Sequence, residues 1–174
     1  MSDYDTEYYN NEWINDGRNR IHKDAKIFPN VKLGKGNQIG PFAVIGSNGE
    51  IRDVDQTKFK GWVQIGDNNV ISELVTIQRP YEAEATIIGN DNILMAHSHI
   101  GHNAKICNNV EICTGAIIGG YAVINNDAKI KLGVTVRNRV IVGKGSLVGF
   151  QSAVAKNVPE NDVQVGVPAK SIKK

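Results

Sequence analysis

An aliphatic residue recurs at every sixth position along most of the chain. Three uninterrupted runs follow this spacing, and every position on them holds Ile, Leu or Val. The runs are Ile21, Ile27, Leu33, Ile39, Ile45 and Ile51; Ile65, Ile71 and Ile77; and Ile88, Leu94, Ile100, Ile106, Ile112, Ile118, Ile124, Ile130, Val136, Val142, Val148 and Val154. A repeat of this regularity indicates one small structural unit that is used many times.

A period of six excludes an α-helix, because 3.6 residues per turn would spread these side chains around the whole helix. Short strands joined by tight corners satisfy the period, since three six-residue units close a triangular coil of roughly 18 residues. The aliphatic side chains then stack in columns inside the coils, and small residues fill the corners. The pattern predicts an all-β fold, a parallel β-helix of about seven coils.

Glycine often lies directly after the aliphatic residue. We expect these glycines to adopt turn conformations that other residues avoid. They are Gly34, Gly40, Gly46, Gly66, Gly89, Gly101, Gly119, Gly143 and Gly149.

The repeat defines one domain over residues 21–155, with two interruptions and two ends that do not follow it. Each interruption predicts a loop extruded from the β-helix, near residues 52–64 and 78–87, and such loops often carry binding groups. Residues 1–20 are expected to form an arm or cap over the first coil. We expect the C-terminal tail, residues 156–174, to turn back along the outside of the coils.

Composition narrows the possible functions. The net charge of +2 comes from scattered charges, so no basic stripe for nucleic acid is present. No apolar run approaches the roughly 20 residues of a membrane-spanning helix, and the N-terminus does not resemble a signal peptide. Cys107 and Cys113 suggest no disulfide framework. These features favour a cytoplasmic protein without nucleic-acid or membrane partners.

Three of the four histidines lie in the stretch "ILMAHSHIGHNAKI", as His97, His99 and His102. This stretch is part of "GWVQIGDNNVISELVTIQRP...IIGNDNILMAHSHIGHNAKICNNVEICTGAIIGGYAVI", which resembles the UDP-N-acetylglucosamine acyltransferases. The earlier "IHKDAKIFPNVKLGKGNQIGPFAVIG" resembles the first coils of that family. The resemblance covers most of residues 21–155 and implies that the β-helix is left-handed.

The resemblance also implies residue roles. His102 falls on the general base of the family and His99 on a substrate-binding histidine, with His97 as a further candidate acceptor contact. Gly120 falls on the glycine whose amide holds the thioester carbonyl. Lys58 falls on a lysine that contacts the sugar nucleotide.

Several positions depart from the family. Asn103 replaces an aspartate that usually follows the base, and Tyr121 and Arg137 replace two further active-site histidines. The C-terminal helical domain of the family is not present, and the ending "AKNVPENDVQVGVPAKSIKK" looks like that of small hexapeptide acetyltransferases acting on sugars with acetyl-CoA. The acyl donor is therefore expected to be acetyl-CoA or acyl carrier protein.

The repeat by itself predicts part of the site. Positions 102, 120 and 138 are 18 residues apart, so His102, Gly120 and Asn138 should stack on one face. Imidazole suits a general base near neutral pH, and a glycine amide suits an oxyanion. Asn103 can orient the imidazole but carries no charge to stabilise the imidazolium, so a carboxylate such as Glu82, Glu84 or Asp91 is a candidate substitute.

These observations predict a homotrimeric acyltransferase with sites between subunits, acting on an amino or hydroxyl group of a nucleotide-linked sugar. Pantetheine would pass Tyr121, Arg137 and Asn138, and Lys156 and Lys170 would meet the 3′-phosphate of CoA. No metal is expected.

Two alternatives remain open. The first is a metalloenzyme like the γ-class carbonic anhydrases, which share this fold, although the other two zinc ligands would fall on Cys107 and near Gln78. His97 and His99, two apart on one strand, would share a face. The second is a non-catalytic β-helix that serves in assembly.

Overall fold

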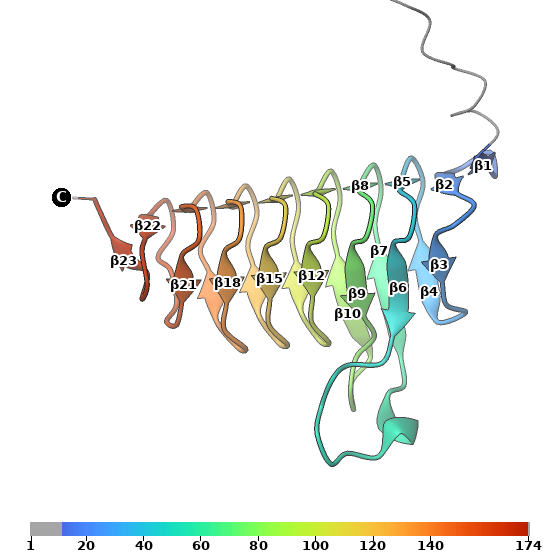
Figure 1. The fold of residues 1–174 in the computed structure, drawn as a ribbon, viewed down its shortest axis with the longest axis horizontal. Coiled ribbons are helices and arrows are strands. Elements are labelled where there is room, and N and C mark those ends of the chain that lie inside the picture. The colour runs from blue at the N-terminus through green and yellow to red at the C-terminus, as the bar shows by residue number, and fades with distance from the viewer. Residues whose placement is uncertain (1–11, 174) are drawn as a thin grey trace, which may run out of the picture.

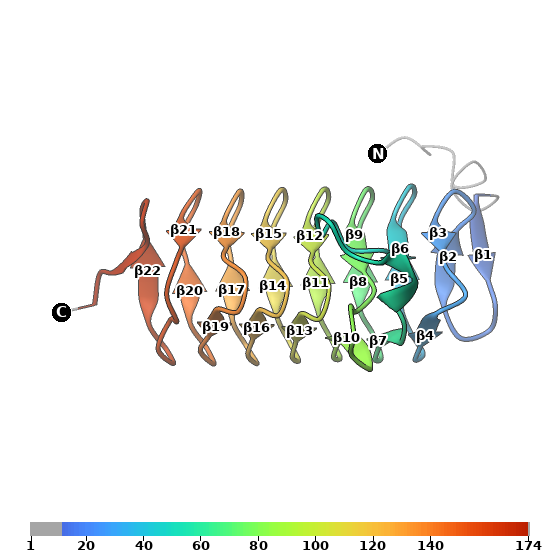
Figure 2. The same cartoon turned by 90° about the horizontal axis from the view of Figure 1, so that it is seen from below.

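The computed structural model describes residues 12–173, in which the strands form three sheets. The chain passes through the three sheets in turn, and each complete turn adds one coil to the stack (Figures 1 and 2). This confirms the predicted all-β fold, a left-handed parallel β-helix. The second sheet contains seven strands, one from each coil, in agreement with the predicted number of about seven coils.

The strands of each sheet follow one another along the stack of coils. The first contains β1 (Trp13–Asn15), β2 (Arg20–His22), β5 (Gln38–Ile39), β8 (Val70–Ile71), β11 (Ile93–Leu94), β14 (Glu111–Ile112), β17 (Lys129–Ile130), β20 (Leu147–Val148), β22 (Val163–Val165) and β23 (Lys170–Ser171). The second contains β3 (Lys26–Ile27), β6 (Val44–Ser47), β9 (Thr76–Gln78), β12 (His99–Ile100), β15 (Ile117–Ile118), β18 (Thr135–Val136) and β21 (Ala153–Val154). The third contains β4 (Val31–Leu33), β7 (Trp62–Ile65), β10 (Ala85–Ile88), β13 (Lys105–Ile106), β16 (Val123–Ile124) and β19 (Ile141–Val142).

The aliphatic residues of the repeat form the core. Ile100 pairs with Ile118 in the second sheet, and Ile106 pairs with Ile124 in the third. All four side chains are fully buried. Because successive residues of a strand point to opposite faces, the alternate positions point outward and are available to form a site.

The glycines that follow the aliphatic residues do not have the predicted role. Among those named above, only Gly46 has a positive φ, and the left-handed corner positions are instead held by residues such as Asn68, Asn103 and Asp127. The glycines are needed because neighbouring coils approach them closely. A Cβ on Gly101, for example, would lie 2.7 Å from the backbone nitrogen of Gly120.

Two segments leave the β-helix on the same side. The first, residues 48–61, connects β6 to β7 and contains the 3-10 helix η1 (Gln56–Lys58); it forms the large loop of Figure 1. The second, residues 79–84, connects β9 to β10. Phe59 of the first loop is only 1% exposed and packs against Tyr81 of the second, with ring centroids 5.0 Å apart. The two loops therefore support each other.

The ends of the β-helix are closed by antiparallel strands. At the N-terminal end β1 pairs with β2, and the rest of the expected arm, with Tyr4, Tyr8 and Tyr9, lies outside the described residues. At the C-terminal end the prediction that the tail returns along the outside is wrong, because β22 adds to the first sheet and β23 pairs with it. No helix within residues 12–173 is long and apolar enough to cross a membrane.

A column of buried asparagines lies inside the N-terminal coils. Asn37 Oδ1 accepts hydrogen bonds from the backbone N–H and the side-chain amide of Asn69, at 2.9 and 3.0 Å. Asn19 Oδ1 accepts the same two bonds from Asn37, and Asn69 Oδ1 accepts one from the backbone of Asn92. The next position of the column is Val110, whose N–H donates to Asn92 Oδ1. The column thus links five successive coils by hydrogen bonds to asparagine side chains.

Candidate active site

His102, Gly120 and Asn138 occupy three successive corners between the second and third sheets. The coils are joined there by backbone hydrogen bonds from Tyr121 N–H to His102 O and from Arg139 N–H to Gly120 O, each 3.0 Å long. Gly120 lies directly against the His102 ring, since a Cβ at this position would be 2.7 Å from Nε2. The structure therefore brings together the three residues that the period places on one face.

These corners line a cavity of about 340 Å³. His99 on β12 and Gln78 at the end of β9 form its second-sheet side, and Glu50 reaches it from the first loop. An adjoining groove shares Asn138 with the cavity and continues along the second sheet past Thr135 and Arg137 to Ala153. The combined surface offers a short polar cavity and an extended, largely apolar track.

Asn103 fixes the tautomer of His102. Asn103 Oδ1 accepts a hydrogen bond from the backbone N–H of Tyr81 at 3.0 Å, and its Nδ2 donates to Tyr81 O at 3.2 Å. These two bonds determine the orientation of the amide, because a backbone N–H can only donate and a carbonyl can only accept. His102 Nδ1, 2.7 Å from the same Oδ1, must therefore carry the proton and donate it. In the neutral imidazole Nε2, the atom beside Gly120, is then free to accept a proton.

The His102 ring is also held by aromatic side chains. Phe59 and Tyr121 meet it edge-on, with ring centroids 6.4 and 5.2 Å away. Its backbone N–H donates to Gln78 Oε1 at 3.2 Å, and the residue as a whole is 9% exposed. Arg139 lies over the ring of Tyr121, with its guanidinium carbon 4.1 Å from the ring centroid. These contacts restrict the movement of the ring.

The amide of Gly120 provides a hydrogen-bond donor beside this base. Within residues 12–173 no atom accepts a hydrogen bond from Gly120 N–H. Gly120 and His102 both line the cavity, so a ligand in the cavity would contact both residues. A carbonyl carbon bound there would have a base on one side and an oxyanion donor on the other.

The other two histidines of the stretch are separated. His99 lines the cavity, and its Nδ1 lies 2.7 Å from Thr76 Oγ1. Burial lowers the pKa of His99, an effect opposed by the negative charge of Glu50 and strengthened by His102. His97 instead lies exposed at a corner with a φ of 59°. The prediction that His97 and His99 share a strand face is therefore wrong, because the strand begins only at His99.

Glu50 is the carboxylate of the cavity, at a position that the six-residue period does not predict. The three candidates named for this role lie elsewhere: Glu82 pairs with Lys58, Glu84 lines a different cavity, and Asp91 accepts from Asn68. Glu50 comes just before the first interruption of the repeat, where the period no longer predicts the direction in which a side chain points. Only the path of the loop places it beside His99 and His102.

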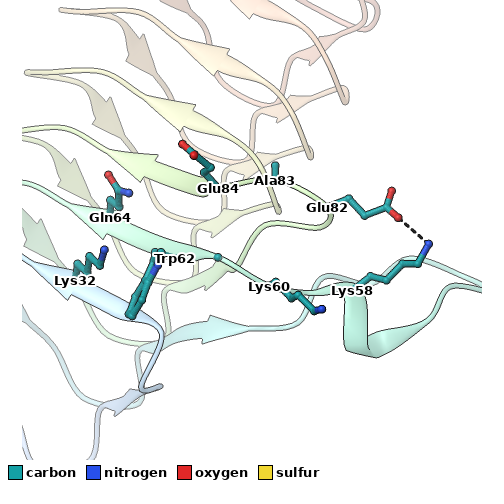
Figure 3. A pocket seen from close by; sticks show the side chains of 9 residues that line it. Lys32, Lys58, Lys60, Trp62, Gln64, Glu82, Ala83 and Glu84 are labelled. Carbon is teal, nitrogen blue, oxygen red and sulfur yellow. Dashed lines mark hydrogen bonds and ion pairs between the residues drawn. The ribbon is translucent and has the colours of Figure 1, made fainter.

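Lys58 does not line the cavity of His102. Its ammonium group donates to Glu82 Oε1 at 2.8 Å, and this hydrogen bond raises the pKa of Lys58. The pair borders a second cavity of about 720 Å³ on the third-sheet side, shown in Figure 3. In the same cavity Lys32 Nζ lies 4.0 Å from the ring centroid of Trp62, which is 41% exposed.

The residues expected at the donor end lie further along the stack. Arg137 lines the groove, while Lys156 is exposed at the corner after β21 and Lys170 is exposed on β23. Neither lysine lines the cavity or the groove. Their proposed contact with CoA stays a prediction.

Side chains that could bind a metal gather away from His102. Within the described part of the chain, the one such group is Glu12, His22 and Asp24 at the N-terminal end. The positions aligned with zinc ligands have other contacts. Gln78 Oε1 accepts the backbone N–H of His102, and Cys107 Sγ lies 3.9 Å from Asn125 Oδ1.

The chain is similar in sequence to known proteins. The family model "Bacterial transferase hexapeptide (six repeats)" matches residues 85–120. The acyl-[acyl-carrier-protein]–UDP-N-acetylglucosamine O-acyltransferase of Synechocystis sp. is 37% identical over 141 residues, 80% of this chain and 50% of the relative. The enzyme of the same name from Pseudomonas putida is 30% identical over 191 residues, covering 88% of this chain and 73% of the relative.

A solved structure is also similar. The crystal structure of LpxA, a UDP-N-acetylglucosamine acyltransferase from Bacteroides fragilis, has a TM-score of 0.84 and 30% sequence identity. The match covers 88% of this chain and 60% of that one. The chain thus spans about half the length of the first curated relatives it matches.

Proposed function

The chain belongs to the UDP-N-acetylglucosamine acyltransferase family of hexapeptide-repeat proteins, and on this premise we propose that it transfers an acyl group from a thioester to a nucleotide-linked sugar. The observation that carries the proposal is the contact between His102 Nε2 and Gly120, in a cavity where Asn103 holds the ring in the proton-accepting tautomer. The relatives are named for an acyl carrier protein donor and a UDP-N-acetylglucosamine acceptor.

The geometry supports a direct transfer without a covalent enzyme intermediate. The acceptor atom attacks the thioester carbonyl while His102 Nε2 takes its proton, and the oxygen of the carbonyl receives a hydrogen bond from Gly120 N–H. His102 then returns the proton to the departing thiolate. His99 and Gln78 line the acceptor side of the cavity, and the groove past Asn138 and Arg137 fits an extended pantetheine arm.

Neither cysteine is needed for this reaction. Burial raises the pKa of Cys113 to about 11, so its thiol stays protonated and non-nucleophilic. Cys107 does not line the cavity.

We also propose that the active unit is a homotrimer, in which a neighbouring subunit completes each site. The cavity of a single chain is small, about 340 Å³, and only a few polar side chains line it. Light scattering coupled to gel filtration should give three times the mass of the 174-residue chain.

The test is a transfer assay with purified protein, acyl carrier protein or CoA thioesters and UDP-sugar acceptors, with release of free thiol as the signal. Loss of a general base lowers the rate by about 100- to 10,000-fold, so His102→Ala should abolish most of the transfer. His97→Asn is the matched control, since it removes an exposed histidine outside the cavity and asparagine tolerates a positive φ.

Two results would contradict the proposal. Undiminished transfer by His102→Ala would remove the role of the base, and no transfer from any donor would favour an assembly protein. Stoichiometric zinc in the purified protein would favour the metalloenzyme alternative.

A further inference from the structure

Glu50 is anchored at the rim of the His102 cavity by the residue before it. Gly49 is buried, and a Cβ on it would lie 2.9 Å from both His102 Cδ2 and Phe59 Cε1. The backbone of the first loop therefore touches the ring of the base. Glu50, the next residue, is exposed and lines the cavity, so the packing of Gly49 places the backbone of Glu50 close to His102.

The carboxylate of Glu50 is not neutralised by the protein. Among residues 12–173 it makes no hydrogen bond or ion pair. Arg79, which contacts the same loop, donates its Nε–H to Asn48 Oδ1 at 2.7 Å instead. A carboxylate held next to a reaction site without a cationic partner is suited to bind a cation.

The rest of the cavity carries little charge at neutral pH. Burial lowers the pKa of His99, so this side chain is neutral there. The group that hydrogen-bonds His102 Nδ1 is the neutral amide of Asn103, where a carboxylate would have strengthened the base. Glu50 is thus the one formal negative charge among the described residues that line the cavity.

We propose that the acceptor of this enzyme is an amino sugar, and that Glu50 selects it by binding the ammonium form of the reacting amine; this rests on the acyl transfer proposed above. A neutral amine attacks a thioester without prior loss of a proton, so it asks less of the base than a hydroxyl does. His102, whose Nδ1 is hydrogen-bonded to the uncharged amide of Asn103, is a strong enough base to take a proton from an amine nitrogen. The negative charge of Glu50 attracts an ammonium group but gives no such advantage to a hydroxyl group.

The proton balance of this reaction is simple. The bound ammonium first loses one proton to solvent, past Glu50, and becomes a free amine. Its nitrogen forms a bond to the thioester carbon, the carbonyl π electrons move to the oxygen facing Gly120 N–H, and one N–H proton passes to His102 Nε2. The C–S bond then breaks, and the thiolate takes the proton from His102. The products are an amide, a thiol and one proton in solution.

The experiment compares pairs of UDP-sugars that carry an amine or a hydroxyl at the same ring carbon, one pair for each ring position. Transfer to each is measured as kcat/KM with acetyl-CoA and with acyl carrier protein thioester, and resistance of the product to hydroxylamine distinguishes an amide from an ester. We expect the amine of one pair to be preferred about tenfold or more. Glu50→Gln should lower kcat/KM for that amine by about 10- to 100-fold, mainly through KM, and should lower kcat/KM for the hydroxyl sugar by a much smaller factor.

Asp53→Asn provides the matched control. It removes a carboxylate from the same loop, at a site 86% exposed and paired with Arg52, and should not alter the preference. Equal or better transfer to the hydroxyl sugars, or an equal loss for both sugars in Glu50→Gln, would overturn the inference and leave the proposed acyl transfer intact. Transfer to neither member of any pair would instead overturn the proposed function.

Discussion

Gly120→Ala tests the contact on which the candidate site depends. The new Cβ would lie 2.7 Å from His102 Nε2, 2.9 Å from Cε1 and 3.1 Å from Cδ2. Optimal separations between such atoms are about 3.5–4.0 Å, so the ring would have to move by several tenths of an ångström. Asn103, Phe59 and Tyr121 hold the ring on its other sides and oppose this movement.

The expected cost follows from these contacts. Overpacking of a fixed group costs about 1–3 kcal/mol. For a chain of 174 residues, 1 kcal/mol lowers Tm by about 2–4 °C, so the variant should melt roughly 2–12 °C below the parent. The backbone adds no penalty, because Gly120 does not have a positive φ. Displacement of the oxyanion donor should also lower kcat by about 100-fold or more.

A double-mutant cycle separates this contact from a general effect of the substitution. In a His102→Ala background the obstacle is gone, and Gly120→Ala should be neutral or slightly stabilising, since alanine restricts the unfolded chain more than glycine does. Thermal unfolding of the four proteins gives the coupling. An equal drop in Tm in both backgrounds would refute the predicted contact between Gly120 and the His102 ring.

Three further predictions concern the supports of the site. Phe59→Ala removes the buried side chain that joins both loops to His102 and should cost about 3–5 kcal/mol, measured by thermal unfolding together with kcat; an unchanged Tm would contradict it. Asn37→Leu should destabilise more than Asn92→Leu, by about 1–3 kcal/mol in denaturant unfolding. It removes the acceptor of the Asn69 backbone N–H, one of two acceptors of Asn69 Nδ2 and the two bonds that Asn37 Nδ2 donates, whereas Asn92→Leu removes only the acceptor of Val110 N–H, because Asn92 Nδ2 already lacks a partner; equal losses would count against the column. Burial makes the pKa of His99 lower in the folded chain than in the unfolded chain, so the imidazole binds a proton more tightly in the unfolded chain. Stability should therefore fall as pH drops below the unfolded value of about 6.5, and His99→Gln should flatten this slope in unfolding curves recorded across that range.

The sequence predicts those features that follow the period. Ile100, Ile106 and their equivalents define the coils, and the 18-residue interval is sufficient to place Gly120 against His102. The period also indicates where the chain leaves the β-helix, because Ile51 and Ile65 are out of phase.

The remaining features depend on contacts between segments that have no common period. Glu50 reaches the cavity through the path of an irregular loop, and the amide of Asn103 is oriented by the backbone of Tyr81 in another loop. The prediction for His97 is wrong because side chains alternate between two faces only within a strand. His97 lies at a corner, with a φ of 59°, before the strand begins. For Lys58, alignment with the family gives a position in the sequence but not the direction of a side chain on an extruded loop.

The asparagine column has a consequence for how such an enzyme can change. Its members are 18, 32 and 23 residues apart, so it spans the coils that are separated by the two loops. Beyond Asn92, where the interval returns to 18 residues, Val110 takes its place. Where a loop makes the connection between two coils longer than 18 residues, the hydrogen bonds of the asparagine column therefore set the alignment of those coils.

A loop inserted between two such coils can be lengthened, shortened or exchanged while the strands on either side keep their pairing. The coil that carries His102 can thus stay aligned with the coil that carries Gly120 even where the length of the two loops changes. The column separates the alignment of the coils from the length of the segments between them, so the loops that support the His102 ring can differ in length on the same β-helix.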